Sequence, residues 1–202
     1  MSRAADHPVD AIFLDRWSPR SFTGEPVPDA VLQSAFEAAR WAPSASNVQP
    51  WRFLVTRPGD SWWETYLAFL MPRNRLWAAQ ASALVLILSS RLVERRGQVV
   101  ENVSHSFDAG AAWANFAHQA LLLGWHTHGI GGFDRDAARA RLAIPEDFAI
   151  EAMIALGRKG ELDALDPEFH GSEAPSGRRP LGETVFAGLL SALAFTDGKD
   201  AA

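Results

Sequence analysis

The sequence predicts a single compact domain built from alternating helices and strands. Its 202 residues fall within the usual size of one domain, although two small domains are also compatible with that length. Helical spacing of apolar residues alternates along the chain with short apolar runs that are typical of strands. The hydrophobic fraction of 48% supplies enough apolar side chains for a sizeable core. Together these observations predict an α/β domain.

Three segments carry helix signals. Apolar residues recur at helical spacing over residues 29–41, and Pro43 ends that helix. A longer helix is predicted over residues 108–123, where Gly124 provides the stop signal. A short helix is expected over residues 134–142.

Three further segments are predicted to form the sheet. Residues 51–56 are closed by a Pro-Gly pair, and residues 83–89 are continuously apolar, which favours a strand buried on both faces. Residues 152–156 complete the predicted core. The polar residues 91–106, ahead of the long helix, are expected to form an irregular, mobile insertion.

Composition argues against several classes of function. A net charge of −5 without a concentrated basic stripe argues against a nucleic-acid partner. Because the chain has no cysteine, disulfides, thiolate nucleophiles and cysteine-ligated metals are excluded. The longest apolar run, residues 81–88, is far shorter than the roughly 20 residues of a membrane span. Residues 1–10 also lack a signal-peptide pattern. We therefore expect a cytoplasmic protein with no membrane partner.

The first candidate site is Arg16-Trp-Ser-Pro-Arg20, where two guanidiniums lie close in sequence to the hydroxyl of Ser18. Such groups suit a phosphate monoester, because guanidinium forks give bidentate contacts and a short hydroxyl reaches a further oxygen. Each charge-assisted hydrogen bond contributes about 1.5–3 kcal/mol. The alternative is a pair of solvated surface arginines, and taken alone these residues favour that alternative.

The second candidate is the polar loop of residues 43–51, which contains Asn47 and Gln49 ahead of Trp51. A turn rich in small polar residues and bracketed by prolines presents side-chain and backbone donors in a fixed arrangement. The pyrimidine edge of a flavin ring needs amide and hydroxyl partners of that kind. The alternative is an ordinary connection between a helix and a strand.

The third candidate is the glycine-rich segment Gly129-Ile-Gly-Gly-Phe133. Glycines let the backbone approach a flat ligand closely and expose its N–H groups. The segment is not a dinucleotide fingerprint, because G-x-G-x-x-G has a different spacing and opens a helix after a strand. Since the chain has no other such fingerprint, any nicotinamide nucleotide is expected to bind transiently.

His126 and His128, with His105 and His118 elsewhere in the chain, suggest a metal site as an alternative. No acidic residue lies beside the first pair at ligand spacing, and a metal site needs three or four ligands. We therefore predict no metal site. The serines lack a G-x-S-x-G elbow, so nucleophilic hydrolysis is not predicted either.

In their order along the chain, these motifs resemble those of the FMN-dependent nitroreductase family. The family's opening arginine–serine–arginine motif is similar to residues 16–22, and the most specific match is the helix and loop of residues 38–51. The family's later Gly-Phe-Asp and Ile-Pro-Glu are similar to residues 131–134 and 144–146. Its closing Ala-Leu-Gly and Arg-Pro-Leu are similar to residues 155–157 and 179–181, so the resemblance covers about residues 12–186.

The resemblance implies an α+β sandwich in which helices flank a central, mostly antiparallel sheet. It also implies an intertwined homodimer with two FMN sites at the subunit interface. Residues 1–202 would then form one domain, and we expect about residues 185–202 to pack on the partner subunit.

The resemblance also implies a role for each residue of this chain that stands at a matching position of the family's motifs. Arg16, Ser18 and Arg20 would hold the phosphate and ribityl chain with Arg178, and Asn74 would reach the ribityl chain or the ring. Residues 44–47 would come from the other subunit, and the backbone near residues 131–132 would face N5 and O4 of the ring. The full expected set of cofactor-binding residues is Arg16, Trp17, Ser18, Arg20, Pro43, Ser44, Ala45, Ser46, Asn47, Gln49, Asn74, Ile130, Gly131, Gly132, Arg178 and Arg179.

Two positions depart from the family pattern. Trp17 stands where a second basic residue is frequent, and Ser176 stands where a lysine often accompanies the closing arginine. Fewer cations near the phosphate or the N1–C2=O edge of the ring would weaken FMN binding or stabilise the reduced anion less.

The resemblance also implies an activity, in which hydride passes from NADH or NADPH through the flavin to a small acceptor such as a nitroaromatic, quinone or enal. Positioning and electrostatics are the protein's part in this chemistry, so we assign no catalytic acid or base. One alternative is a flavin enzyme of the same fold that catalyses dehalogenation or flavin fragmentation, and another is a non-catalytic flavin-binding protein. Acceptor choice would depend on residues 62–69 and 91–105. The aromatic residues of the first segment either stack on an acceptor or, as Trp62 and Trp63 could, cover the dimer core.

Overall fold

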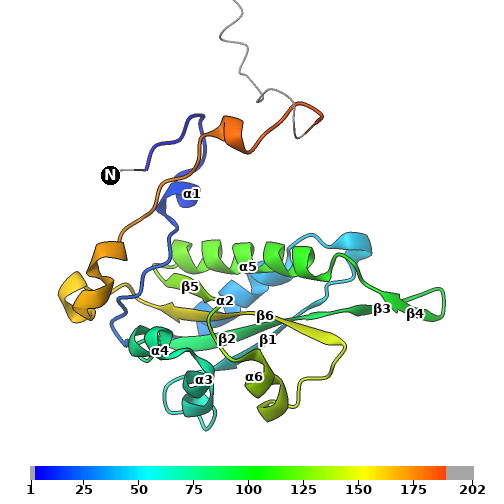
Figure 1. Ribbon diagram of the computed structural model, residues 1–202, viewed down its shortest axis with the longest axis horizontal. Coiled ribbons are helices and arrows are strands. Elements are labelled where there is room, and N and C mark those ends of the chain that lie inside the picture. Colours follow the sequence, from blue (N-terminus) through cyan, green and yellow to red (C-terminus); the bar gives the residue numbers. More distant parts are fainter. Residues whose placement is uncertain (1–2, 190–202) are drawn as a thin grey trace, which may run out of the picture.

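The computed structural model describes residues 3–189 (Figure 1). The helices are α1 (Ala11–Asp15), α2 (Asp29–Arg40), α3 (Trp63–Phe69), α4 (Pro72–Ala78), α5 (His105–Leu122) and α6 (Arg135–Arg141). The strands are β1 (Trp51–Thr56), β2 (Ala83–Ser90), β3 (Leu92–Arg95), β4 (Gln98–Glu101), β5 (His126–Ile130) and β6 (Phe148–Gly157). The helices expected at residues 29–41 and 134–142 and the strands expected at 51–56 and 83–89 are confirmed to within one residue at each end.

A four-stranded antiparallel sheet forms the centre of the fold, in the order β1-β2-β6-β5. β2 is an inner strand, and every residue from Ala83 to Ser89 is buried, as its continuous apolar run predicted. The predicted α+β class with an antiparallel sheet is therefore confirmed.

Helices cover both faces of this sheet (Figure 1). α2 and α5 pack on one face, around a core that includes Phe116 and Trp125. α3, α4 and α6 pack on the other face, around a core that includes Trp77 and Met153. The sheet is thus the middle layer between two hydrophobic cores.

The prediction of an irregular insertion at residues 91–106 is wrong. β3 and β4 pair as an antiparallel hairpin that projects from the body of the protein (Figure 1). Arg96 and Gly97 have φ values of 53° and 76°, which suit a two-residue hairpin turn. The charged residues Glu94 and Arg95 obscure the alternation of apolar and polar side chains by which a strand is recognised in the sequence. Helix α5 begins at His105 rather than at the predicted residue 108.

β6 is longer than the predicted strand at residues 152–156. The prediction began too late because the charged Glu151 interrupts the apolar run of the strand. In the structure Glu151 is the extra residue of a β-bulge. Ile87 of β2 pairs with Ala152, whereas the next residue, Leu88, pairs with Ile150. Bulges of this kind redirect a side chain and are frequent beside active sites.

The aromatic residues of α3 are core residues of their own chain. Trp63, Tyr66 and Phe69 are buried on the sheet, so they neither stack on an acceptor nor cover a dimer core. Trp62 is 44% exposed, and the guanidinium of Arg141 lies 5.6 Å from its ring.

The N-terminal segment and the tail lie side by side, away from the sheet (Figure 1). Arg3 joins them, because its Nε donates to the carbonyl of Ser176 at 2.8 Å and its Nη1 donates to the carbonyls of Leu14 and Arg16 at 2.7 Å. The expected partner-binding tail, about residues 185–202, lies largely outside the described residues. Within residues 3–189, no helix has the length and apolar character needed to cross a membrane.

Candidate functional site

A cluster of three guanidiniums lies where the N-terminal segment meets the tail. Arg16 follows α1, and Arg3 and Arg178 line a cavity of about 370 Å³ together with Asp6 and Ser176. Within residues 3–189, none of the three arginines forms an ion pair with a carboxylate. This region therefore concentrates positive charge beside a cavity.

The pKa values of the cluster show that its charges repel one another. Burial lowers the pKa of Arg16, and the charges of Arg3 and Arg178 lower it further. Burial and then Arg178 also lower the pKa of Arg3. Because arginine stays charged at neutral pH, an anion bound here would relieve the repulsion. Ser18 Oγ lies 3.4 Å from Arg16 Nη1, so the expected hydroxyl is next to the cluster.

Arg20 lies in different surroundings from Arg16. Its Nη1 donates to Ser172 Oγ at 3.2 Å and lies 3.8 Å from Glu173 Oε2. The backbone N–H groups of Arg20 and Ser21 donate to Glu173 Oε1 at 2.8 and 2.9 Å. The structure thus separates the two arginines of the opening motif, and Glu173 fixes the backbone at the second of them.

The polar loop between α2 and β1 has an uncommon backbone. Ser46, Asn47 and Gln49 have φ values of 53°, 55° and 52°, in the left-handed region that favours glycine. Residues in this region cost of order 1–3 kcal/mol each and gather at functional sites. The loop keeps this shape through Ser44, whose Oγ accepts from the N–H of Gln49 at 3.0 Å and whose carbonyl accepts from the N–H of Asn47.

Helix α5 also holds this loop. The N–H of Ala45 donates to Asp108 Oδ2 at 3.1 Å, and Asp108 is only 3% exposed. A buried carboxylate needs such partners, so the contact ties the loop to the long helix. The tip of the loop remains open, because Ser46 and Asn47 are exposed.

The glycine turn after β5 forms a third group with Asn74. Asn74 Nδ2 donates to the carbonyl of Gly132 at 3.0 Å, and the N–H of Met71 donates to the same oxygen at 3.1 Å. A Cβ at residue 132 would lie 2.7 Å from Asn74 Nδ2, so glycine is required there for this packing. Gly131 has no neighbour within 4 Å of an added Cβ, and it is exposed.

The expected site residues therefore fall into separate groups within one chain. Arg16, Ser18 and Arg178 gather near Arg3, whereas Arg20 pairs with Glu173. Asn74 joins Gly132. Of the remaining expected residues, Ile130 is the buried end of β5, Trp17 is half-buried, Pro43 is exposed, and Arg179 lines the cavity beside Arg178.

Comparison with known proteins gives this arrangement a context. Residues 14–70 match the model of the nitroreductase family. A protein from Thermus thermophilus named NADH dehydrogenase is 32% identical over 175 residues, which cover 73% of this chain and 85% of that protein. The chain belongs to the nitroreductase family.

Solved structures agree with this membership of the nitroreductase family. An oxidoreductase described as containing FMN superposes with a TM-score of 0.91 at 42% identity, over 94% of this chain and 96% of that one. A protein from Desulfovibrio desulfuricans, solved in complex with FMN, superposes with a TM-score of 0.70 at 29% identity, over 91% and 98% of the two chains.

Four residues that hold these groups in place were not predicted from the sequence. Arg3 lies far from Arg178 in sequence, and Glu173 and Asp108 contact segments distant from their own. Arg135 donates to the carbonyl of Gly131 from the helix that follows. Of these four residues, only Arg135 is suggested by its place in the sequence, because it lies three residues after the glycine pair Gly131–Gly132.

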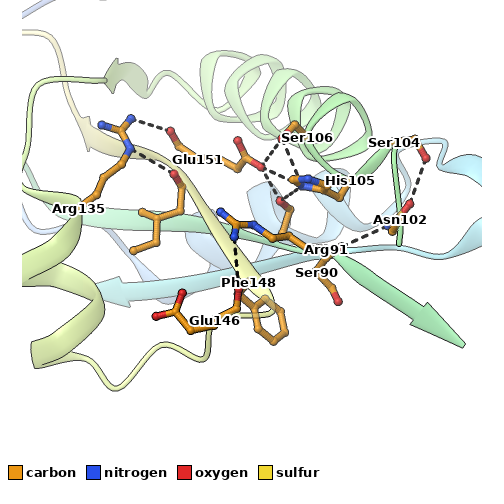
Figure 2. Close-up of polar contacts among 12 residues, drawn as sticks. Ser90, Arg91, Asn102, Ser104, His105, Ser106, Arg135, Glu146, Phe148 and Glu151 are labelled. Carbon is orange, nitrogen blue, oxygen red and sulfur yellow. Dashed lines mark hydrogen bonds and ion pairs between the residues drawn. The ribbon is translucent and has the colours of Figure 1, made fainter. Parts of the chain in front are cut away.

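A further polar cluster centres on Glu151 (Figure 2). Ser106 Oγ and Ser89 Oγ both donate to its Oε1, and His105 Nδ1 lies 3.4 Å from the same oxygen. Both hydroxyls also lie within hydrogen-bond distance of His105 Nδ1, Ser89 Oγ at 2.7 Å and Ser106 Oγ at 3.2 Å. Within residues 3–189, no group of three or more possible side-chain ligands could hold a metal ion.

Proposed function

We propose that this protein is an FMN-dependent oxidoreductase that takes hydride from NADH or NADPH and delivers it to a small acceptor. The observation that carries the proposal is the repelling cluster of Arg3, Arg16 and Arg178 beside a cavity. A phosphate monoester fits this donor set, because its charge offsets the repulsion and its oxygens accept bidentate hydrogen bonds.

The glycine turn fits the other end of FMN. Among the described residues, the N–H groups of Gly131 and Gly132 have no hydrogen-bond partner. Such free donors, on a backbone without side chains, suit the polar edge of a flat ring. We assign the phosphate to the arginine cluster and the ring to this turn.

The proposal includes a homodimer with a site at each interface. Among the described residues, the polar loop of residues 44–49 makes its hydrogen bonds within itself, to Asp108 of α5 and to Arg52 of β1, rather than to the arginine cluster or the glycine turn. A second copy could therefore bring its own loop to the ring. Large apolar side chains remain exposed near this loop and at the start of α5, where Trp41 is 72% exposed and Phe107 is 84% exposed. Such exposure marks an interface when the residues are contiguous.

The chain's own residues bind and orient in this proposal. When bound, FMN would supply the redox chemistry, accepting hydride from the nicotinamide and passing it on. The arginine cluster would hold the phosphate, the glycine turn would orient the ring, and the 44–49 loop would exclude water from its edge. No described residue is assigned as a catalytic acid or base.

The acceptor is a small molecule, such as a nitroaromatic, a quinone or an enal. Membership of the nitroreductase family supports this class. We assign acceptor choice to the exposed ring of Trp62, which precedes α3, and to the projecting β3–β4 hairpin, since the aromatic residues of α3 itself are buried.

Anaerobic reduction tests the proposal. Flavin-loaded protein is mixed with NADH and, separately, with NADPH, and absorbance is followed at about 450 nm, where oxidised flavin absorbs. We expect bleaching with at least one donor, followed by recovery when a nitroaromatic or quinone is added. A flavin that stays oxidised with both donors contradicts the reductase proposal, and irreversible loss of flavin under oxygen identifies flavin fragmentation instead.

A further inference from the structure

The sheet leaves a gap beside the glycine turn. β5 ends at Ile130, which pairs with Met153 of β6. The strand β6 itself extends back to Phe148, and within residues 3–189 no strand pairs with residues 148–152 on the β5 side. The bulge at Glu151 lies in this unpaired stretch.

Arg135 of α6 takes the place of the missing strand. Its Nε donates to the carbonyl of Ile150 at 3.3 Å and its Nη2 donates to the carbonyl of Glu151 at 3.1 Å. Figure 2 shows the guanidinium of Arg135 beside Glu151. The third nitrogen, Nη1, donates to the carbonyl of Gly131 at 3.1 Å. One side chain therefore ties the glycine turn to the sheet.

The contact with Gly131 has a directional consequence. In a trans peptide the C=O and the next N–H point in opposite directions. When Arg135 holds the Gly131 carbonyl, the N–H of Gly132 must point away from the guanidinium. The following carbonyl, that of Gly132, is held in turn by Asn74 and Met71. The hold on the Gly131 carbonyl therefore fixes the orientation of the free N–H of Gly132, and the hold on the Gly132 carbonyl fixes the peptide that follows it.

Arginine is the residue type that can bind the carbonyls of Ile150, Glu151 and Gly131 together. A planar guanidinium presents several donors in a fixed fork and can bind three carbonyls at once, whereas lysine offers a single ammonium. Arg135 also stacks over the ring of Phe133, 4.5 Å from its centroid, which limits its rotation.

We propose that Arg135 is a positioning residue, which orients the N–H group of Gly132 toward the flavin ring. This inference rests on the proposed FMN site. Arg135 itself touches the backbone of the turn rather than the cofactor.

The test compares two flavins and three variants as apoproteins. FMN and riboflavin, which lacks the phosphate, are each titrated into wild type, Arg135→Met, Arg135→Lys and Arg141→Met. Arg141→Met is the matched control, because Arg141 is on the same helix and contacts Trp62 instead of the turn. The visible absorption spectrum of each bound flavin is also recorded, since it responds to hydrogen bonds at the ring, and urea unfolding checks that each variant folds.

We expect Arg135→Met to weaken FMN and riboflavin by the same factor, about tenfold, and to shift the spectrum of the bound flavin. Arg135→Lys should give an intermediate loss, which provides the answer if the methionine variant does not fold. Arg141→Met should match wild type. Wild-type affinity and spectrum in both Arg135 variants, or a loss confined to FMN, would overturn the inference and leave the proposed function intact. Failure of wild type to bind either flavin would overturn both.

Discussion

The carboxylate of Glu173 accepts a hydrogen bond at 2.8 Å from the backbone N–H of Arg20, which lies 153 positions earlier in the chain. The same oxygen accepts from the N–H of Ser21 at 2.9 Å, and the Glu173 side chain is only 5% exposed. The tail of the protein thus holds the backbone of the opening motif. Loss of this carboxylate should therefore disturb the region of Arg16 and Arg20 without removing an arginine.

Glu173→Ala is expected to lower the free energy of unfolding by about 1.5–3 kcal/mol, because two buried N–H groups lose a charged acceptor. Glu173→Gln keeps an acceptor oxygen in place and should cost clearly less. Urea unfolding of the apoproteins measures both. Equal losses in the two variants would show that the carboxylate charge, rather than the backbone contacts, is what stabilises this region.

The two arginines of the opening motif should differ in their effect on FMN. Arg16→Gln is expected to weaken FMN binding roughly 10–100-fold, because a phosphate would lose a charge-assisted contact. Arg20→Ala should weaken it less, since its guanidinium is already next to Glu173. FMN titration measures both, with Arg57→Gln as the control because Arg57 forms a surface ion pair with Asp29. A larger loss for Arg20→Ala would mean that Arg20 leaves Glu173 when FMN binds.

The left-handed backbone of the polar loop predicts opposite responses to glycine at neighbouring positions. At Ser46, whose φ is 53°, glycine relieves backbone strain of about 1–2 kcal/mol. This gain offsets the entropic cost of ordering a glycine, so the free energy of unfolding should not fall. At Ala45, which has no positive φ, glycine should lower the free energy of unfolding by about 0.5–1 kcal/mol. Thermal unfolding of Ser46→Gly and Ala45→Gly apoproteins tests this, and an equal loss at both positions would contradict it.

Three partly buried histidines predict loss of stability in mild acid. Burial lowers the pKa of His118, His126 and His128 below the ordinary value of 6.5. The unfolded chain then binds protons more readily than the folded one, so stability is fully present above pH 6.5 and falls as the pH drops through the folded-state pKa values. Each histidine can contribute at most roughly 1.4 kcal/mol per pH unit.

His128→Asn isolates one of these contributions. The ring of His128 bonds the carbonyl of Pro19 through Nδ1 at 3.0 Å, and an asparagine amide can donate in its place without titrating in this range. Urea unfolding between about pH 7 and pH 5 should therefore show a shallower dependence in the variant. An unchanged slope would mean that His128 has the same pKa in the folded and unfolded chains.

Periodicity alone was enough to place several elements. The bounds of β2 and α2 were predicted to within one residue, because β2 is continuously buried and α2 has apolar residues at helical spacing, and β1 was predicted at its observed bounds with the help of the Pro-Gly pair that follows it. The β3–β4 hairpin was missed because its turn places Arg96 in a conformation that sequence rules assign to Gly, Asn or Asp.

The chemistry of the site was predicted better than its organisation. The groups of Arg16 with Arg178 and of Asn74 with Gly132 contain expected residues. Arg3, Glu173 and Arg135 were not expected, because each acts through contacts that exist only after folding. A local motif can indicate which groups bind an anion, but not which distant side chain holds the motif in place.

Titration of FMN into the apoprotein tests the central claim most directly. We expect the fluorescence of FMN to be quenched until one FMN is bound per chain, with the affinity reduced in Arg16→Gln. Riboflavin should bind more weakly than FMN to wild type and with equal affinity to wild type and Arg16→Gln, because the arginine cluster is assigned to the phosphate. Absence of saturable binding, or equal affinity of wild type for FMN and riboflavin, would contradict the account.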